Sequence, residues 1–358
     1  MPAPRTFRMV SKLRISIVEY LNTAPLVWGF TNGPLRGKYD LSFTVPSQCA
    51  EDLRAGRAEV AIIPAIEYQR IAGLAILPDM AIASKNRVRS LLIVAKKPIE
   101  QVKSFALDSS SRSTQALTRI LCAEKWRIAP QFTEALPDLP EMLQTRDAAL
   151  LIGDAALRVS LGIEKAVIEK DRSTGAPGQP VRDRSWIMDF PDSGKDSLSP
   201  TPRLTFQPST FNRFKESPVI RQAATLAITG PELLYVYDVV SEWRAMTGLP
   251  AVLAVWAARR ELATAELTAD FLASRDFGLA HLGEISYEAS HDLELPQRAL
   301  ESYLRDNINF SLDAENRRGL ELYFEYAAKL GLIPQAGAIH WAAAKSEAVK
   351  LLTVGDSV

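Results

Sequence analysis

Short apolar runs alternate along most of the chain with longer segments that carry apolar residues at helical spacing. Runs of this length, rich in leucine and β-branched residues and bounded by polar positions, are typical of buried strands. The predicted strands are residues 13–18, 41–45, 60–63, 91–95, 150–152 and 251–255. Strands that alternate with helices predict an α/β fold.

The segment between the second and third predicted strands has the signals of a helix. It begins at Ser47, continues in helix-forming residues and ends at Ala55 and Gly56. A helix between two neighbouring strands predicts a βαβ crossover. From Glu261 onward the spacing is helical almost to the end, and Gly331 follows the last periodic residue, as a helix-terminating glycine does.

Residues from about 161 to 233 interrupt this alternation with proline, serine, aspartate and glycine. We predict a long, partly irregular insertion that is peripheral to the chemistry. Its apolar residues suggest that part of it docks on the body of the protein or on a partner: Trp186, Ile187, Met188 and Phe190.

Composition limits the classes of function. A chain of 358 residues with 47% hydrophobic content is long enough for two domains. Forty-two Lys and Arg residues balance 42 Asp and Glu residues, so no overall field attracts nucleic acid or an anionic membrane. An anionic ligand would need a local binding site.

The chain offers no pattern for a metal or for an organic cofactor. Cys49 and Cys122 fit neither a disulfide framework nor a zinc site and are predicted to be buried free thiols, and the histidines are scattered at 281, 291 and 340. No apolar run reaches the roughly 18 residues of a membrane helix, and no signal-peptide core is recognisable. We expect a cytoplasmic protein.

The best candidate anion site is the run Asp-Ser-Ser-Ser-Arg-Ser-Thr at residues 108–114, between a predicted strand and a helix. Free N–H groups at the helix start, the helix dipole and nearby hydroxyls together bind a carboxylate. The candidate substrate-binding residues are Ser111, Arg112, Ser113 and Thr114. Plain helix capping by these serines is the alternative.

Two further polar segments follow predicted strands, where α/β folds open their ligand crevice. Asn22 and Thr23 follow the first strand, and Gly153 and Asp154 follow the strand at 150–152. Glycine permits close approach of a ligand or of backbone. Helix capping is an alternative for Asn22 and Thr23, and it is the favoured interpretation for Asp154.

In this order, the segments resemble the menaquinone-biosynthesis family that includes chorismate dehydratase. The clearest match is the pattern Tyr-Leu-Asn-Thr-x-Pro-Leu at residues 20–26. Each further motif is weak alone, but the ordered combination is specific: Ile63-Pro64, Glu67-Tyr68, Val88-x-Ser90, residues 111–114, residues 151–154, and Trp243 with residues 247–250.

The resemblance implies a fold like that of the type II periplasmic binding proteins, with two lobes, a hinge and a ligand cleft between the lobes. We expect the crossings between lobes near Ala95 and Pro250. The first lobe would then comprise residues 1–95 and 255–358. The second would comprise residues 96–254, including the insertion at about 161–233.

The family's reaction, a lyase reaction, removes water from chorismate to give 3-[(1-carboxyvinyl)oxy]benzoate. By this resemblance, Asn22 and Ser90 lie at the reacting centre as catalytic residues. Substrate-binding residues would be Thr23, Ser111, Arg112, Ser113, Thr114, Gly153 and Asp154. No histidine lies in any motif, so the substrate's own enolpyruvyl carboxylate is a candidate for the base.

Some positions depart from the family. Asn86 replaces the usual glycine before Val-x-Ser, and we expect it to keep a positive φ angle. Ser113-Thr114 stands where Thr-Ser is commoner, which preserves the donor groups, and the insertion has no counterpart.

Three alternatives remain. One is the sister enzyme of the same pathway, a 1,4-dihydroxy-6-naphthoate synthase type, which generally lacks the Tyr-Leu-Asn-Thr pattern and is thought to use a histidine. Another is a non-catalytic anion-binding protein of the same fold, although such proteins usually carry a signal peptide. The third, the sensing half of a transcription regulator, would need a DNA-binding domain that the chain does not suggest.

The absence of a ligand cluster in the sequence predicts that turnover needs no metal. Dialysis of the protein against a chelator should leave the rate unchanged. A loss of activity that one divalent ion restores would contradict this.

Overall fold

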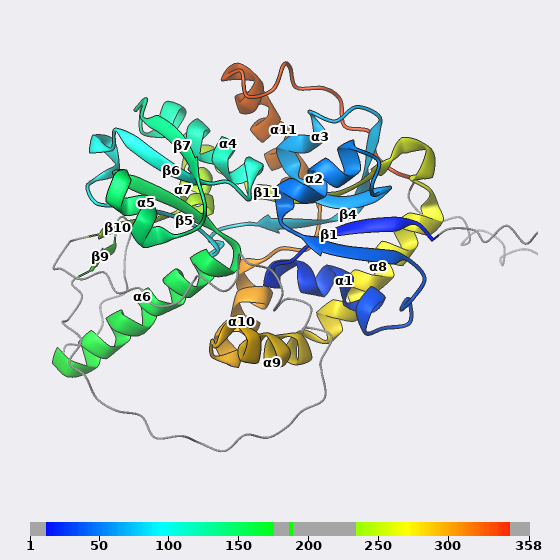
Figure 1. The fold of residues 1–358 in the computed structure, drawn as a ribbon, viewed down its shortest axis with the longest axis horizontal. Helices are drawn as coiled ribbons and strands as arrows, with labels where there is room; N and C mark the ends of the chain where they lie inside the picture. The colour runs from blue at the N-terminus through cyan, green and yellow to red at the C-terminus, as the bar shows by residue number, and fades with distance from the viewer. Residues whose placement is uncertain (1–11, 175–185, 189–233, 344–358) are drawn as a thin grey trace, which may run out of the picture.

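Two sheets lie side by side in the computed structural model, which describes residues 12–174, 186–188 and 234–343 (Figure 1). The five-stranded sheet has the order β2 (Asp40–Thr44), β1 (Arg14–Val18), β3 (Val60–Pro64), β11 (Ala251–Arg259) and β4 (Leu74–Ser84). The six-stranded sheet has the order β7 (Gln131–Ala135), β6 (Ser104–Asp108), β8 (Ala148–Ile152), β5 (Leu91–Ala95), β10 (Leu234–Asp238) and β9 (Trp186–Met188).

Both sheets are mixed. In the first, β1 pairs in parallel with β2 and β3, while β11 runs antiparallel to β3 and β4. In the second, β6 is parallel to β7 and β8, and β5 is antiparallel to β8 and β10. Every residue of β3, β5 and β8 is buried, which explains why these strands are continuous apolar runs. All six predicted strands are confirmed.

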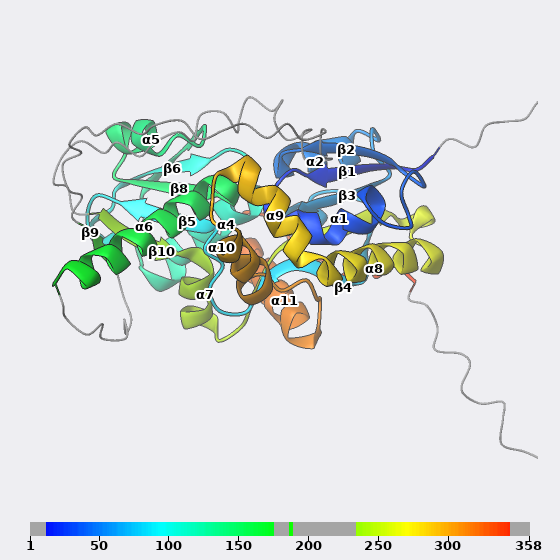
Figure 2. The same cartoon turned by 90° about the horizontal axis from the view of Figure 1, so that it is seen from below.

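Helices cover the faces of both sheets (Figures 1 and 2). The crossover helix predicted at residues 47–55 is present as α2, and Gly56 after it has a positive φ of 69°. The helices up to α7 are η1 (Leu21–Thr23), α1 (Ala24–Thr31), α2 (Pro46–Arg54), α3 (Ala65–Tyr68), η2 (Ile99–Gln101), α4 (Arg112–Ile120), η3 (Leu121–Lys125), α5 (Leu139–Thr145), α6 (Gly153–Thr174) and α7 (Val239–Thr247).

The predicted helical tail is confirmed. It comprises η5 (Arg260–Leu262), α8 (Ala265–Ala280), α9 (Leu282–Leu293), α10 (Gln297–Ser302), the π-helical turn η6 (Tyr303–Asn307) and α11 (Ala314–Lys329). Gly331 follows α11 with a φ of 68°. No helix in the described ranges is long and apolar enough to cross a membrane.

The predicted insertion is more regular at its ends than expected. Helix α6 continues to Thr174, so the irregular stretch does not begin near residue 161. Strand β9 pairs with β10, so the predicted docking holds for Trp186, Ile187 and Met188. Phe190 and the remainder of the insertion, residues 175–185 and 189–233, lie outside the described residues.

The chain passes from the first sheet to the second within residues 85–90, between the end of β4 and the start of β5. This position precedes the crossing expected near Ala95, because β5 belongs to the second sheet. The return lies at residues 248–250, between α7 and β11, close to the expected Pro250. We therefore propose lobe boundaries within these two segments.

The positive φ in the first crossing is at Arg89 (65°), so the expectation for Asn86 was wrong.

Helices α1 and α8 cross closely because α8 has a glycine at the contact. A Cβ atom at Gly278 would lie 1.9 Å from the carbonyl oxygen of Pro25, which is backbone and has little freedom to move.

The Gly278→Ala variant should therefore lose about 2 kcal/mol of unfolding free energy in urea titrations. Gly283→Ala is the matched control, since nothing lies within 4 Å of its Cβ. Equal stability of the two variants would contradict this account of the crossing.

Candidate functional site

The segments that follow β1, β6 and β8 meet one another, as the sequence predicted. The hydroxyl of Tyr20 donates to the Oγ of Ser110 over 3.1 Å. The backbone N–H of Leu21 donates to the Oδ1 of Asp154 over 3.2 Å. These contacts join the first sheet's segment to the two segments of the second sheet, so the three predicted polar segments lie together where the sheets meet.

Asn22 and Thr23 lie in η1 and are 8% and 1% exposed. Neither side chain caps a helix, although Thr23 occupies the N-cap position of α1. The Thr23 hydroxyl instead donates to the Oδ1 of Asn22 at 3.4 Å. The Asn22 side chain also lies beside the hydroxyl of Tyr303, where it opposes the rise in the pKa of Tyr303 that burial causes. The capping alternative therefore does not describe these two residues.

Ser90 is fully buried and lies at the end of the first crossing. Its Oγ accepts a hydrogen bond of 2.9 Å from the hydroxyl of Tyr303. Tyr303 thus binds Ser90 and lies beside Asn22. The sequence analysis missed Tyr303 as a site residue because its helical spacing indicates a core position, and it is indeed only 1% exposed.

The Asp238 carboxylate holds the first crossing in place. It accepts the N–H groups of Val88 (3.1 Å) and Arg89 (2.7 Å), and its Oδ1 caps α7 through Val240 and Ser241. Burial raises the pKa of Asp238, and these hydrogen bonds to the charged form oppose that rise. The backbone directly before Ser90 is therefore fixed by a side chain of the second lobe.

Two serines of the run at residues 108–114 form hydrogen bonds that stabilise the fold. Ser111 caps α4, since its Oγ accepts the N–H of Thr114 (3.4 Å) and lies 3.0 Å from the Thr114 Oγ1. The Oγ of Ser113 accepts the N–H of Ile66 over 3.1 Å. The N–H groups in the first turn of α4, including those of Arg112 and Ser113, have no intrahelical acceptor. With the helix dipole they retain the character of an anion site.

Arg112 lies in a salt-bridge network between the lobes. Its guanidinium contacts Glu51 at 2.7 Å and Glu67 at 3.1 Å. Glu67 is fully buried and also binds Arg54 and Arg70. Substrate binding by Arg112 stays a prediction, but the guanidinium already has two carboxylate partners that hold α4 against α2 and α3.

Gly153 has a φ of 61°, and a Cβ there would lie 2.9 Å from the ring of Tyr20. Glycine is therefore required both by the backbone and by the close approach of the ring. Asp154 next to it binds Leu21 in the other lobe. Burial is the main cause that raises the pKa of Asp154 to about 6; the nearby Glu19 contributes to this rise, and the N–H of Leu21 opposes it.

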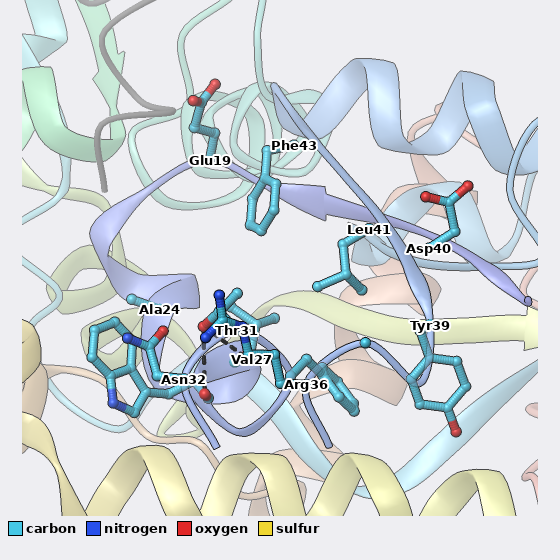
Figure 3. Close-up of a pocket in the computed structure, with 13 residues that line it drawn as sticks. Glu19, Ala24, Val27, Thr31, Asn32, Arg36, Tyr39, Asp40, Leu41 and Phe43 are labelled. Carbon is cyan, nitrogen blue, oxygen red and sulfur yellow. Dashed lines mark hydrogen bonds between the residues drawn. The ribbon is translucent and has the colours of Figure 1, made fainter. Parts of the chain in front are cut away.

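A separate pocket of about 310 Å³ runs between α1 and β2 (Figure 3). It contains none of the predicted site residues and approaches the site only through Glu19 and Ala24, which flank the Tyr20–Thr23 segment. Glu19 is 8% exposed, and burial raises its pKa. The other lining residues are Val27, Trp28, Phe30, Thr31, Asn32, Arg36, Gly37, Tyr39, Asp40, Leu41 and Phe43.

The part of the chain that the structure describes has no group of three or more His, Cys, Asp and Glu residues able to hold a metal ion. Cys49 and Cys122 are buried free thiols, as predicted. Burial raises the pKa of each thiol to about 12, so both stay protonated at neutral pH.

The salt-bridge network around Glu67 predicts that removing the charge of this one residue lowers the stability of the protein substantially. Glu67→Gln leaves three arginines without their buried partner, so the unfolding free energy should fall by about 3 kcal/mol in urea titrations. The control is Glu266→Gln, because Glu266 is 82% exposed and pairs with Lys38 at 3.5 Å. That variant should lose less than about 1 kcal/mol. Equal losses would mean that Glu67 contributes no more than a surface pair.

The sequence matches a known protein family and is similar to a characterised relative. The profile of a family described as menaquinone biosynthesis matches residues 13–169 and 224–329. A chorismate dehydratase of Thermus thermophilus is 24% identical over 313 residues, which are 87% of this chain and 93% of the relative.

Solved structures agree on the fold. A protein of Archaeoglobus fulgidus has a TM-score of 0.57 at 16% identity, covering 90% of this chain and 98% of its own. The periplasmic aliphatic sulphonate binding protein SsuA of Escherichia coli has a TM-score of 0.50 at 12% identity, covering 97% of each chain. The expected α/β fold of the periplasmic binding protein type is confirmed. The chain belongs to the menaquinone biosynthesis family.

Proposed function

We propose that this protein is a chorismate dehydratase, a lyase that removes water from chorismate to give 3-[(1-carboxyvinyl)oxy]benzoate in the cytoplasm. The observation that supports this most is that Asn22 and Ser90, from distant parts of the sequence, both lie at the hydroxyl of Tyr303, which donates to Ser90. They do so in a chain that is 24% identical to a chorismate dehydratase over most of its length.

Chorismate carries two carboxylates, and the start of α4 offers a binding position for one of them. The first turn of α4, with Ser111, Ser113 and Thr114, would hold the ring carboxylate through N–H groups and hydroxyls. The proton to be removed lies on the ring carbon that carries the enolpyruvyl ether. Removal of this proton leaves negative charge on that carbon, and the charge spreads toward the ring carboxylate. Donors at that carboxylate therefore stabilise the transition state more than the substrate.

The reacting centre would lie beside Asn22 and Ser90. Their amide and hydroxyl groups are neutral donors, suited to orient the departing hydroxyl on the neighbouring ring carbon and the enolpyruvyl group. Thr23, Gly153 and Asp154 would form the adjoining wall. Formation of the aromatic ring supplies the driving force, so the protein's task is to position the substrate.

The base is proposed to be the substrate's own enolpyruvyl carboxylate. The three histidines lie in the C-terminal part of the chain and have other contacts: the Nδ1 of His281 pairs with the carbonyl of Phe277, the ring of His291 packs on Tyr287, and the backbone of His340 binds Tyr68. Closure of the lobes would exclude water and bring the donors together.

Asn22→Ala and Ser90→Ala test the proposed reacting centre. Loss of a donor aimed at developing charge should reduce turnover of chorismate about a hundredfold, with a melting temperature close to that of the wild type. Ser109→Ala, at the edge of the serine run, should keep the wild-type rate. Near-normal turnover in both site variants would show that these residues are not the reacting centre.

A further inference from the structure

We propose that Tyr303 is a positioning residue that orients Ser90 for the reaction. This inference rests on the proposed dehydration and adds a third residue to the site of Asn22 and Ser90. It is carried by the hydrogen bond from the Tyr303 hydroxyl to Ser90 and by the burial of both side chains.

Tyr303 comes from a part of the chain far from the other two. It opens η6, a π-helical turn that directly follows α10, and Figure 2 shows α10 beside the junction of the two sheets. Such turns are frequent at functional sites, where they redirect a side chain. The side chain is 1% exposed, so its hydroxyl needs protein partners.

The direction of the hydrogen bond to Ser90 has a consequence for the serine. Because the Oγ of Ser90 accepts the proton of Tyr303, the serine's own proton must point elsewhere. No acceptor for that proton is found among the described residues, and in the proposed reaction the substrate would supply one. Tyr303 thereby holds Ser90 as a donor toward the substrate.

A purely structural tyrosine would act differently. Tyr323 is another fully buried tyrosine, but its hydroxyl donates to the backbone carbonyl of Ser113, whose position the helix already fixes. The partner of Tyr303 is the side chain of Ser90, which could otherwise rotate. Phenylalanine would fill the same volume at 303, so Tyr303→Phe removes the orientation and keeps the packing.

The test compares kcat and KM for chorismate in the full-length wild type and in Tyr303→Phe. Loss of orientation should lower kcat about tenfold or more while KM changes less than about twofold. The control is Tyr237→Phe, whose hydroxyl accepts from the N–H of Ile99 at 3.2 Å in the second lobe, and it should keep the wild-type kcat.

The double variant Ser90→Ala/Tyr303→Phe gives the readout that a structural role would not move. If Tyr303 acts through Ser90, the double variant should turn over no more slowly than Ser90→Ala alone. Three results would overturn the positioning role and leave the proposed function standing. They are a wild-type kcat in Tyr303→Phe, a double variant slower than Ser90→Ala by the full factor that Tyr303→Phe causes by itself, and a Tyr303→Phe protein that does not fold. A wild type that does not convert chorismate would overturn the proposed function and this inference with it.

Discussion

Asp238 is the residue on which the geometry of the site depends. Its carboxylate binds the N–H groups of Val88 and Arg89 in the first crossing and those of Val240 and Ser241 at the start of α7. One partly buried carboxylate thus ties the crossing to the second lobe, and Ser90 directly follows Arg89 in the chain. Burying a carboxylate is costly, and several N–H donors offset that cost in a way that one neutral side chain would not.

From Ser90 the constraint continues into the first lobe. The hydroxyl of Tyr303 donates to Ser90 and lies beside Asn22, and the Tyr20–Thr23 segment meets the second lobe through Tyr20 and Leu21. Neutral donors occupy the centre of this arrangement, whereas the formal charges of Glu67 and its arginines lie at the contact of α4 with α2 and α3. This division suits a proposed reaction in which the substrate supplies its own charge and the protein supplies oriented donors.

The sequence predicted the strands and the fold class because burial on both faces produces unmistakable apolar runs. It misplaced the first crossing, since residues 91–95 reveal a buried strand but not the sheet to which it belongs. It named Arg112 as a substrate-binding residue without predicting its salt bridge to Glu67, which lies 45 residues earlier and has no local sign of complete burial. Tyr303 was missed for a similar reason: its partner Ser90 is 213 residues away, and helical periodicity cannot separate a core tyrosine from a site tyrosine.

The central claim is that this site removes water from chorismate, and the most direct measurement offers the pure protein two substrates in separate reactions. One is chorismate and the other is cyclic dehypoxanthine futalosine, with products separated by chromatography and weighed by mass spectrometry. The account predicts that chorismate alone is consumed, giving an aromatic enol ether lighter by one water. Chorismate that is bound but unchanged, or turnover of the second substrate in its place, would contradict it.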